Sequence, residues 1–213
     1  MLRRALALLL VALPAAAFDP YEIQVYDGTA NNPGQFGVEL HLNYASQDAG
    51  HATVEPSFGV TRFWELGAYL EFDKDGFGGA KLRSKFVTPP GTLENFRLGV
   101  NFELARERGQ TGGEIRPILA FETHRVLLAV NPIVGFDSNG SSFEPAGMIK
   151  LRAARHVLAG FEYYGSPAES LHYVFGAIDL VDFPGLELNL GAGVGISGKS
   201  NPFIVKTILG YTF

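Results

Sequence analysis

The sequence predicts an all-β chain that folds as an antiparallel, up-and-down transmembrane β-barrel of about 12 strands. Three observations support this prediction: segments of alternating polarity, connections of two alternating kinds, and an aromatic residue at the end of the last segment. The composition agrees, because 26 glycines, 12% aromatic residues, 18% charged residues and no cysteine describe many turns and wide apolar surfaces without disulfides.

The first 17 residues have the pattern of a cleaved export signal. Arg3 and Arg4 give a basic start, residues 5–13 form an apolar run, and residues 15–17 make an A-x-A cleavage site. The run is shorter than the roughly 18–20 residues of a spanning helix, which argues against an uncleaved anchor. We expect residues 18–33 to form a periplasmic N-terminal extension, with an element tucked against the barrel as the alternative.

The barrel is expected to occupy residues 34–213, where segments of about ten residues alternate in polarity with the period of a strand. Residues 36, 38, 40, 42 and 44 are apolar or aromatic, whereas Glu39, His41 and Asn43 lie between them. The segment 96–104 repeats this pattern around Arg97, Asn101 and Glu103. The faces of the segment 171–180 stay ambiguous.

The connections between these segments fall into two alternating sets, which is typical of a barrel with tight periplasmic turns and larger outside loops. The first set, expected to be very short, lies at 63–65, 88–95, 124–125, 153–155 and 183–185. The second set, richer in turn residues, lies at 45–52, 73–76, 105–113, 137–142, 165–170 and 197–201.

Aromatic residues gather near the predicted strand ends, where interfacial girdles belong. These residues are Tyr44, Phe63, Trp64, Phe72, Phe96, Phe136, Phe143, Tyr163 and Phe183. The last segment places Tyr211 and the terminal Phe213 on one face, which is similar to the C-terminal assembly signal of outer-membrane barrels. Four prolines, at 56, 117, 132 and 145, interrupt predicted strands on their apolar face, and we expect a local bulge at each.

Several stretches resemble one group of proteins. Residues 22–28, 37–44, 57–61, 81–87 and 97–104 look like a group of uncharacterised proteobacterial outer-membrane β-barrels, loosely similar to the MetA-like barrels associated with phenol-degradation pathways. The resemblance covers most of the chain after residue 17. It implies a barrel in the outer membrane of a Gram-negative bacterium but carries no catalytic or ligand residues.

If the apolar face meets lipid, the charged rows point into the lumen. The expected lining charges are Lys81, Arg83, Lys85, Arg97, Arg116, Glu39, Glu55, Glu65, Glu71 and Glu103. The four cations Lys81, Arg83, Lys85 and Arg97 would form a basic wall beside acidic strands, and such a field selects charged solutes. The alternative is that these charges pair across neighbouring strands and fill the interior.

The function that follows is passive passage of small solutes through a porin-like channel, with a plugged structural or surface-interaction barrel as the alternative. A soluble β-sandwich or lipocalin-like barrel would need the apolar face turned inward. An outer-membrane lipid-modifying enzyme is a minor alternative, because the five histidines are scattered and no G-x-S-x-G context surrounds a serine. We expect no catalysis, no cofactor and no metal site, since no His/Cys cluster has ligand spacing.

The expected partners are outer-membrane lipid, the outer-membrane assembly machinery and possible small solutes. The negative net charge argues against nucleic acid as a partner. Of the 17 Lys and Arg residues 15 remain after the two signal arginines are removed, against 22 Asp and Glu, which leaves a balance of −7. That sign opposes the neutralisation of phosphates.

The export signal gives the first testable prediction. The exported chain should begin at Phe18 and fractionate with the outer membrane, because the leader is cleavable and the strands need lipid on one face. N-terminal sequencing of the membrane-extracted protein checks this. A chain that starts at Met1, or that is recovered from the soluble periplasm, would contradict it.

Overall fold

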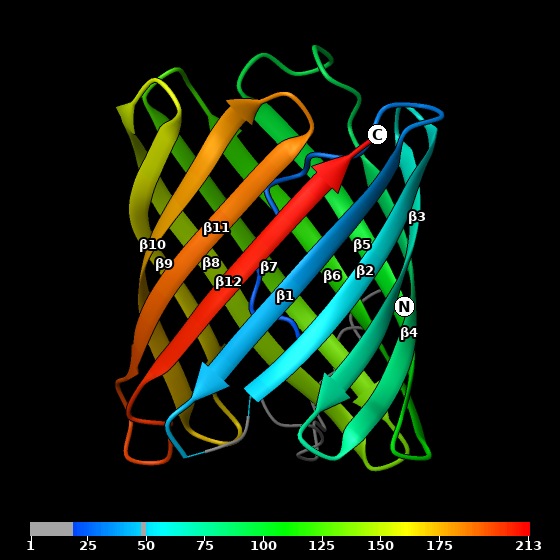
Figure 1. Cartoon of the computed structure of the whole chain (residues 1–213), viewed down its shortest axis with the longest axis vertical. Coiled ribbons are helices and arrows are strands. Elements are labelled where there is room, and N and C mark those ends of the chain that lie inside the picture. The colour runs from blue at the N-terminus through cyan, green and yellow to red at the C-terminus, as the bar shows by residue number, and fades with distance from the viewer. Residues whose placement is uncertain (1–18, 48–49) are drawn as a thin grey trace, which may run out of the picture.

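The computed structural model describes residues 19–47 and 50–213, and the predicted export signal lies outside these residues. The described residues form a closed antiparallel barrel of twelve strands, which confirms the predicted fold class (Figure 1). Within them no helix is long and apolar enough to cross a membrane.

The first six strands are β1 (Phe36–Ala45), β2 (Gly50–Thr61), β3 (Trp64–Asp73), β4 (Gly76–Val87), β5 (Phe96–Glu107) and β6 (Gln110–Glu122). The others are β7 (Val126–Asp137), β8 (Gly140–Ala154), β9 (Val157–Ser166), β10 (Leu171–Phe183), β11 (Leu186–Gly195) and β12 (Ile204–Thr212).

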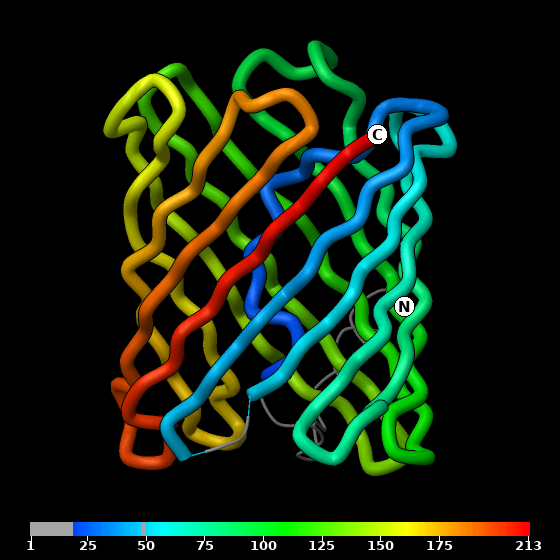
Figure 2. The backbone as a smooth tube through the Cα atoms, viewed as in Figure 1, coloured from blue at the N-terminus to red at the C-terminus, as the bar shows by residue number. Residues whose placement is uncertain are grey.

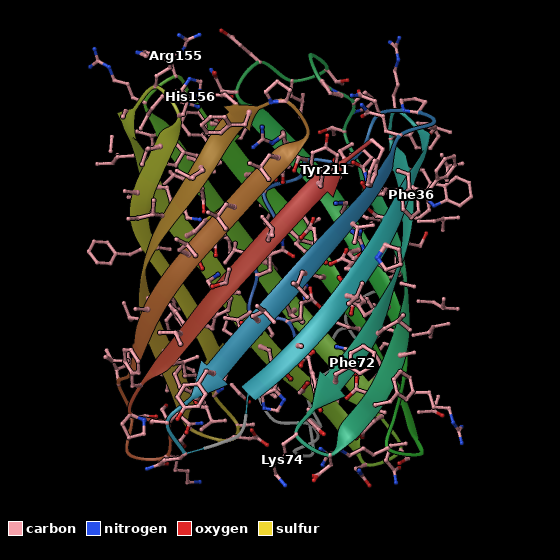
Figure 3. The ribbon with its side chains drawn as sticks, viewed as in Figure 1. Phe36, Phe72, Lys74, Arg155, His156 and Tyr211 are labelled. Carbon is pink, nitrogen blue, oxygen red and sulfur yellow. The ribbon has the colours of Figure 1, made fainter. Side chains whose placement is uncertain are left out.

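The barrel closes where the first strand pairs with the last. β1 and β12 form an antiparallel ladder from Gly37 opposite Thr212 to Ala45 opposite Ile204. Each strand also pairs with its neighbours in sequence, so the meander leaves no free edge. β1 therefore begins at the end of the barrel where β12 stops. We call this the Phe36 end and the opposite one the Lys74 end; Figure 3 labels both residues.

The outer face is apolar and the alternate residues are buried, as the polarity pattern predicts. Large hydrophobic side chains are exposed along the strands, including Leu82 at 67% and Leu104 at 63%. The residues next to them on the same strands, Arg83 and Glu103, are only 3% and 2% exposed. Aromatic residues lie at both ends of this outer surface: Phe36 and Tyr211 are near one end and Phe72 near the other (Figure 3).

The lengths of the connections differ from the prediction. The expected loop at 105–113 is a turn at Arg108 and Gly109, where both residues have positive φ, as the preferred two-residue hairpin turn requires. The ladder consequently continues to Glu107 opposite Gln110. The connection 88–95, expected to be very short, is among the longest, because Pro89 and Pro90 cannot donate to a ladder.

The expectation of proline bulges is wrong. Pairs are missing around Pro56 between β2 and β3, and around Pro117 and Pro132 between β6 and β7, but the register is the same on both sides of each gap. Pro132 stands opposite Pro145 across β7 and β8. The prolines therefore interrupt the ladder of hydrogen bonds between neighbouring strands, but neither strand gains the extra residue that defines a bulge.

Residues 19–33 run inside the barrel. The tube in Figure 2 shows this segment, in dark blue, within the ring of strands. Its residues form hydrogen bonds or ion pairs with side chains of β1 to β7 and of β12. We call it the lumen segment. The sequence left open a periplasmic extension or an element tucked against the barrel for residues 18–33; residues 19–33 lie within the ring of strands, and residue 18 lies outside the described residues.

Candidate functional site

The lumen segment starts at the Lys74 end. The Asp19 carboxylate forms an ion pair with Lys81 of β4, and the Tyr21 hydroxyl donates to Asp73 at 3.0 Å. Burial alone would raise the pKa of Asp19, but the Lys81 ammonium and the Tyr21 backbone N–H outweigh it, and the pKa lies below its usual range. Asn43 of β1 donates to the Pro20 carbonyl at 2.9 Å. The start of the segment is thus fixed to β1, β3 and β4.

The centre of the segment is held at Tyr26. Its backbone N–H donates to Asn131 Oδ1 at 2.7 Å, and Asn131 Nδ2 donates back to the Tyr26 carbonyl at 3.0 Å. Asn131 is fully buried and immediately precedes Pro132, in the stretch where β6 and β7 lack ladder pairs. The Tyr26 hydroxyl contacts that of Tyr69, and the Arg116 guanidinium lies 4.5 Å from the Tyr26 ring centroid. The Asn131 side chain therefore pairs with both backbone groups of Tyr26, as a neighbouring strand would in a β-ladder.

The segment has an apolar side as well. Ile23 and Val25 are 1% and 8% exposed and belong to one hydrophobic cluster with residues from β1, from β6 to β10 and from β12. Tyr173 and Phe175 of β10 are part of this cluster, so apolar residues of β10 point inward. That inward placement explains why polarity alone left the faces of 171–180 ambiguous. Burial of such side chains stabilises by about 1.5–3 kcal/mol each.

At the Phe36 end the segment leaves the lumen beside β5. Arg97 binds the Asp27 carbonyl at 2.7 Å and the Asp27 carboxylate at 3.0 Å. The Asn31 backbone N–H donates to Glu65 at 2.6 Å. A Cβ on Gly59 would lie 2.1 Å from the Asn32 carbonyl oxygen, so only glycine permits this approach.

Other glycines on the inner rows are also approached closely by neighbouring groups. Gly59 is covered by the lumen segment, and a Cβ on Gly67 would lie 2.8 Å from Arg83 Nε. A Cβ on Gly193 would lie 2.6 Å from the Phe175 ring. The missing side chains let neighbours fill the lumen.

The predicted lining charges are all placed among partners. Arg83 contacts Glu55 at 2.6 Å and Glu65 at 2.8 Å, and Lys85 contacts Glu65 at 2.8 Å. Lys81 reaches Glu71 at 3.2 Å in addition to Asp19. The remaining contacts are Arg97 with Glu122 and Asp27, Arg116 with Glu22 and Glu114, Glu103 with Asn101, and Glu39 with Gln24.

These contacts change the expected electrostatics. Lys81, Arg83 and Lys85 stand on one strand, but each has a carboxylate within ion-pair distance, and Arg97 is bound by Asp27 and Glu122. Opposite charges on neighbouring strands cancel over a short distance, especially where they are buried. The four cations therefore do not form an unpaired basic wall beside the acidic strands; each is paired with carboxylates, as in the alternative.

A second ionic cluster lies on the other half of the wall. Lys150 contacts Glu162 and Asp179 at 2.7 Å each, and Lys206 contacts Glu162 at 2.5 Å. Lys206 also donates to the Ile23 carbonyl at 2.8 Å, which ties this cluster to the lumen segment. All four ionic residues are largely buried, so removal of one would leave its partner uncompensated.

Two cavities, which we call vestibules, border residues 19–29 of the lumen segment, and a third of about 650 Å³ lies at the Phe36 end along residues 28–32 and the connection 88–95. One of about 340 Å³ opens along residues 24–29 and is lined by Glu39, Glu55, Lys150 and Glu162 among others. The other, about 310 Å³, lies around Asp19 toward the Lys74 end. The two have no lining residue in common. The two vestibules therefore lie against different parts of the lumen segment, residues 24–29 and residues 19–21.

Sequence reasoning missed the residues that place the segment. Asn131 and Tyr26 carry no charge pattern, and Asp19, Glu22 and Asp27 precede the first strand. Polarity shows which residues share a face of a strand but does not show which segment fills the space inside. The alternating apolar residues Ile23 and Val25 were the one available signal, since they give residues 22–26 two faces without a strand neighbour.

The fold is that of outer-membrane porin-like barrels. The structure is similar to that of the KdgM porin in complex with disordered oligogalacturonate, with a TM-score of 0.69 at 11% identity over 83% of this chain and 99% of that one. It is also similar to the NanC porin (TM-score 0.60, 8% identity, 84% and 98% covered). The Acinetobacter baumannii outer membrane protein Omp33 follows (TM-score 0.58, 8% identity, 84% and 98% covered).

No family model and no curated protein matches the sequence. The resemblance to MetA-like barrels therefore stays a prediction.

Replacing Asn131 with Leu should release the lumen segment while the barrel persists. The change leaves two buried backbone groups of Tyr26 unpaired, at a cost of about 1–3 kcal/mol each. Proteolysis within residues 19–33 should accelerate about tenfold or more, because about 1.4 kcal/mol corresponds to a factor of ten. Time-resolved limited proteolysis with mass spectrometry measures this, and heat-modifiable gel migration reports the barrel.

The matched control is Asn189→Leu. Asn189 binds Asp179 at 2.5 Å and Glu162 at 3.2 Å inside the same barrel, and both of these partners belong to the wall. This control should cleave like the unaltered protein in that segment. Equal cleavage in both variants would show that Asn131 does not hold the segment.

Proposed function

We propose that this chain is an outer-membrane β-barrel of a Gram-negative bacterium that lets small polar solutes cross passively through a lumen narrowed by residues 19–33. The observation that carries the proposal is the closed twelve-stranded barrel, apolar outside and charged inside. About eight strands leave an interior filled by side chains and 16–18 leave an open channel, so twelve give a narrow passage.

The membrane orientation follows from the position of the strand ends. Outer-membrane barrels with an even strand number keep both ends of the barrel chain in the periplasm, so the Phe36 end would face the periplasm. The outward side chains of Tyr211 and Phe213, 49% and 71% exposed, are then available to the assembly machinery and to lipid. Asp19 would lie toward the outer mouth.

The solute is proposed to be small and polar. One similar structure is of a porin in complex with an oligogalacturonate, and a second is of a porin, which supports passage of a solute as the shared role. In this chain the lining charges Glu39, Glu55, Arg83 and Lys85 border the larger vestibule. Because these charges are paired, we expect them to contact a solute at short range rather than attract it from a distance. Catalysis is not part of the proposal.

A plugged barrel without transport is the second candidate. It is favoured by the contacts of the lumen segment with the wall and by the separation of the two vestibules. The two candidates differ in whether the segment leaves a path for hydrated ions.

Planar bilayer recordings separate the two candidates. The protein as exported should give discrete current steps, and Asn131→Leu should raise the step size or the open fraction at least about twofold, because a loosened segment widens the passage. Asn189→Leu should resemble the unaltered protein. A complete lack of steps in all three correctly folded proteins would contradict the channel and support the plugged barrel.

A further inference from the structure

Three side chains on the inner wall, two of which line the larger vestibule, have the arrangement of metal ligands. Glu39 and Glu55 stand directly opposite each other in the β1–β2 ladder, and His41 lies two residues along β1 on the same inner face. One ligand atom from each of these residues lies within 4.8 Å of the others. Such a site crosses two strands, so linear spacing of histidines and cysteines could not reveal it.

The distances suit a metal better than a hydrogen bond. His41 Nε2 lies 3.3 Å from Glu39 Oε2 and 3.4 Å from Glu55 Oε2. Zinc binds nitrogen and oxygen at about 2.0–2.2 Å in tetrahedral geometry, which places two ligand atoms about 3.3–3.5 Å apart. A hydrogen-bonded pair would be closer, at about 2.7–3.2 Å.

The histidine itself is an unusual feature. His41 is fully buried, and neither ring nitrogen has a hydrogen-bond partner within the part of the chain that the structure describes. Glu55 Oε2 is also without one. A buried ring nitrogen without a hydrogen bond is costly, and a cation bound between the two carboxylates would satisfy His41 Nε2 and Glu55 Oε2 together.

Of the carboxylates of Glu39, Glu55 and Glu65, that of Glu39 is the one that forms no ion pair with a lysine or arginine of the described residues. Arg83 binds the other oxygen of Glu55, Oε1, and shares Glu65 with Lys85. Two cations thus face two carboxylates, while Glu39 has only the neutral Gln24 amide at 3.2 Å and the His41 ring. Glu39 and Glu55 line the vestibule of about 340 Å³, which gives an ion a route to the site and room for water as a further ligand.

We propose that Glu39, His41 and Glu55 bind a divalent transition-metal ion of the zinc type at the inner wall of the barrel. One imidazole and two carboxylates are ligands that zinc accepts, with one position left for water. The site would join β1 and β2 next to Gln24, and so would couple metal binding to the position of the lumen segment.

Zinc binding to the purified protein in detergent tests this proposal. After treatment with a chelator, equilibrium dialysis against Zn²⁺ with metal analysis should give one ion per chain. His41→Gln and Glu39→Gln should each weaken binding by at least about 10–100-fold, because loss of an outer-shell partner alone already has that effect. Heat-modifiable gel migration identifies the folded fraction, and only folded protein is analysed.

The matched control is His172→Gln. His172 is a partly buried strand histidine of β10 that accepts or donates a 2.8 Å hydrogen bond with Tyr163, away from the proposed site. This control should keep both the stoichiometry and the affinity. If all variants bind zinc like the unaltered protein, or if the unaltered protein binds none, the site is refuted. Neither result depends on whether the barrel conducts.

Discussion

The rest of the structure depends on the ladder between β1 and β12. In lipid every backbone N–H and C=O must be paired within the protein, and only closure of the sheet achieves this for strands. Closure at twelve strands fixes the interior width. Wall side chains alone do not fill that width, and residues 19–33 occupy part of it beside the two vestibules. The closed ladder therefore creates the space that the lumen segment fills.

The interior holds the lumen segment by two kinds of contact, ionic and apolar. Along β1 to β6, charged residues are paired with one another or with the segment, as in Arg116 with Glu22 at 2.7 Å. Toward β6 to β12, apolar side chains such as Phe175 receive Ile23 and Val25. Unpaired buried charge costs several kcal/mol, so each ionic contact constrains its neighbours. The same contacts that hold the segment also reduce the field that the lumen offers to a solute.

Much of the fold could be predicted because strand polarity is a local signal. Leu82, Arg83 and Leu104 show it directly: alternate residues meet lipid or the interior, and the structure follows that pattern. Closure, strand number and the apolar outer face follow from it. The lengths of the turns were harder to predict from composition. Between β5 and β6 the strands stay paired up to a two-residue turn, because Arg108 and Gly109 both adopt positive φ.

The candidate site was less predictable because its contacts join distant parts of the chain. Tyr26 and Asn131 are separated by 105 positions, and nothing in either neighbourhood marks the pair. Glu55 reaches His41 only through the register of β1 with β2. Residue types on a face can be read from a sequence, whereas the partner across the lumen depends on how the closed barrel and its N-terminal segment pack.

The central claim, that residues 19–33 are packed inside the closed barrel, is tested most directly by cysteine accessibility. The chain has no cysteine, so Val25→Cys and Lys74→Cys each introduce a single thiol. Val25 is 8% exposed in the apolar cluster, whereas the Lys74 side chain is 69% exposed in a turn. In folded protein a charged maleimide should label position 25 on the order of 100-fold more slowly than position 74, since labelling requires local opening. Equal labelling rates in folded protein would contradict the account.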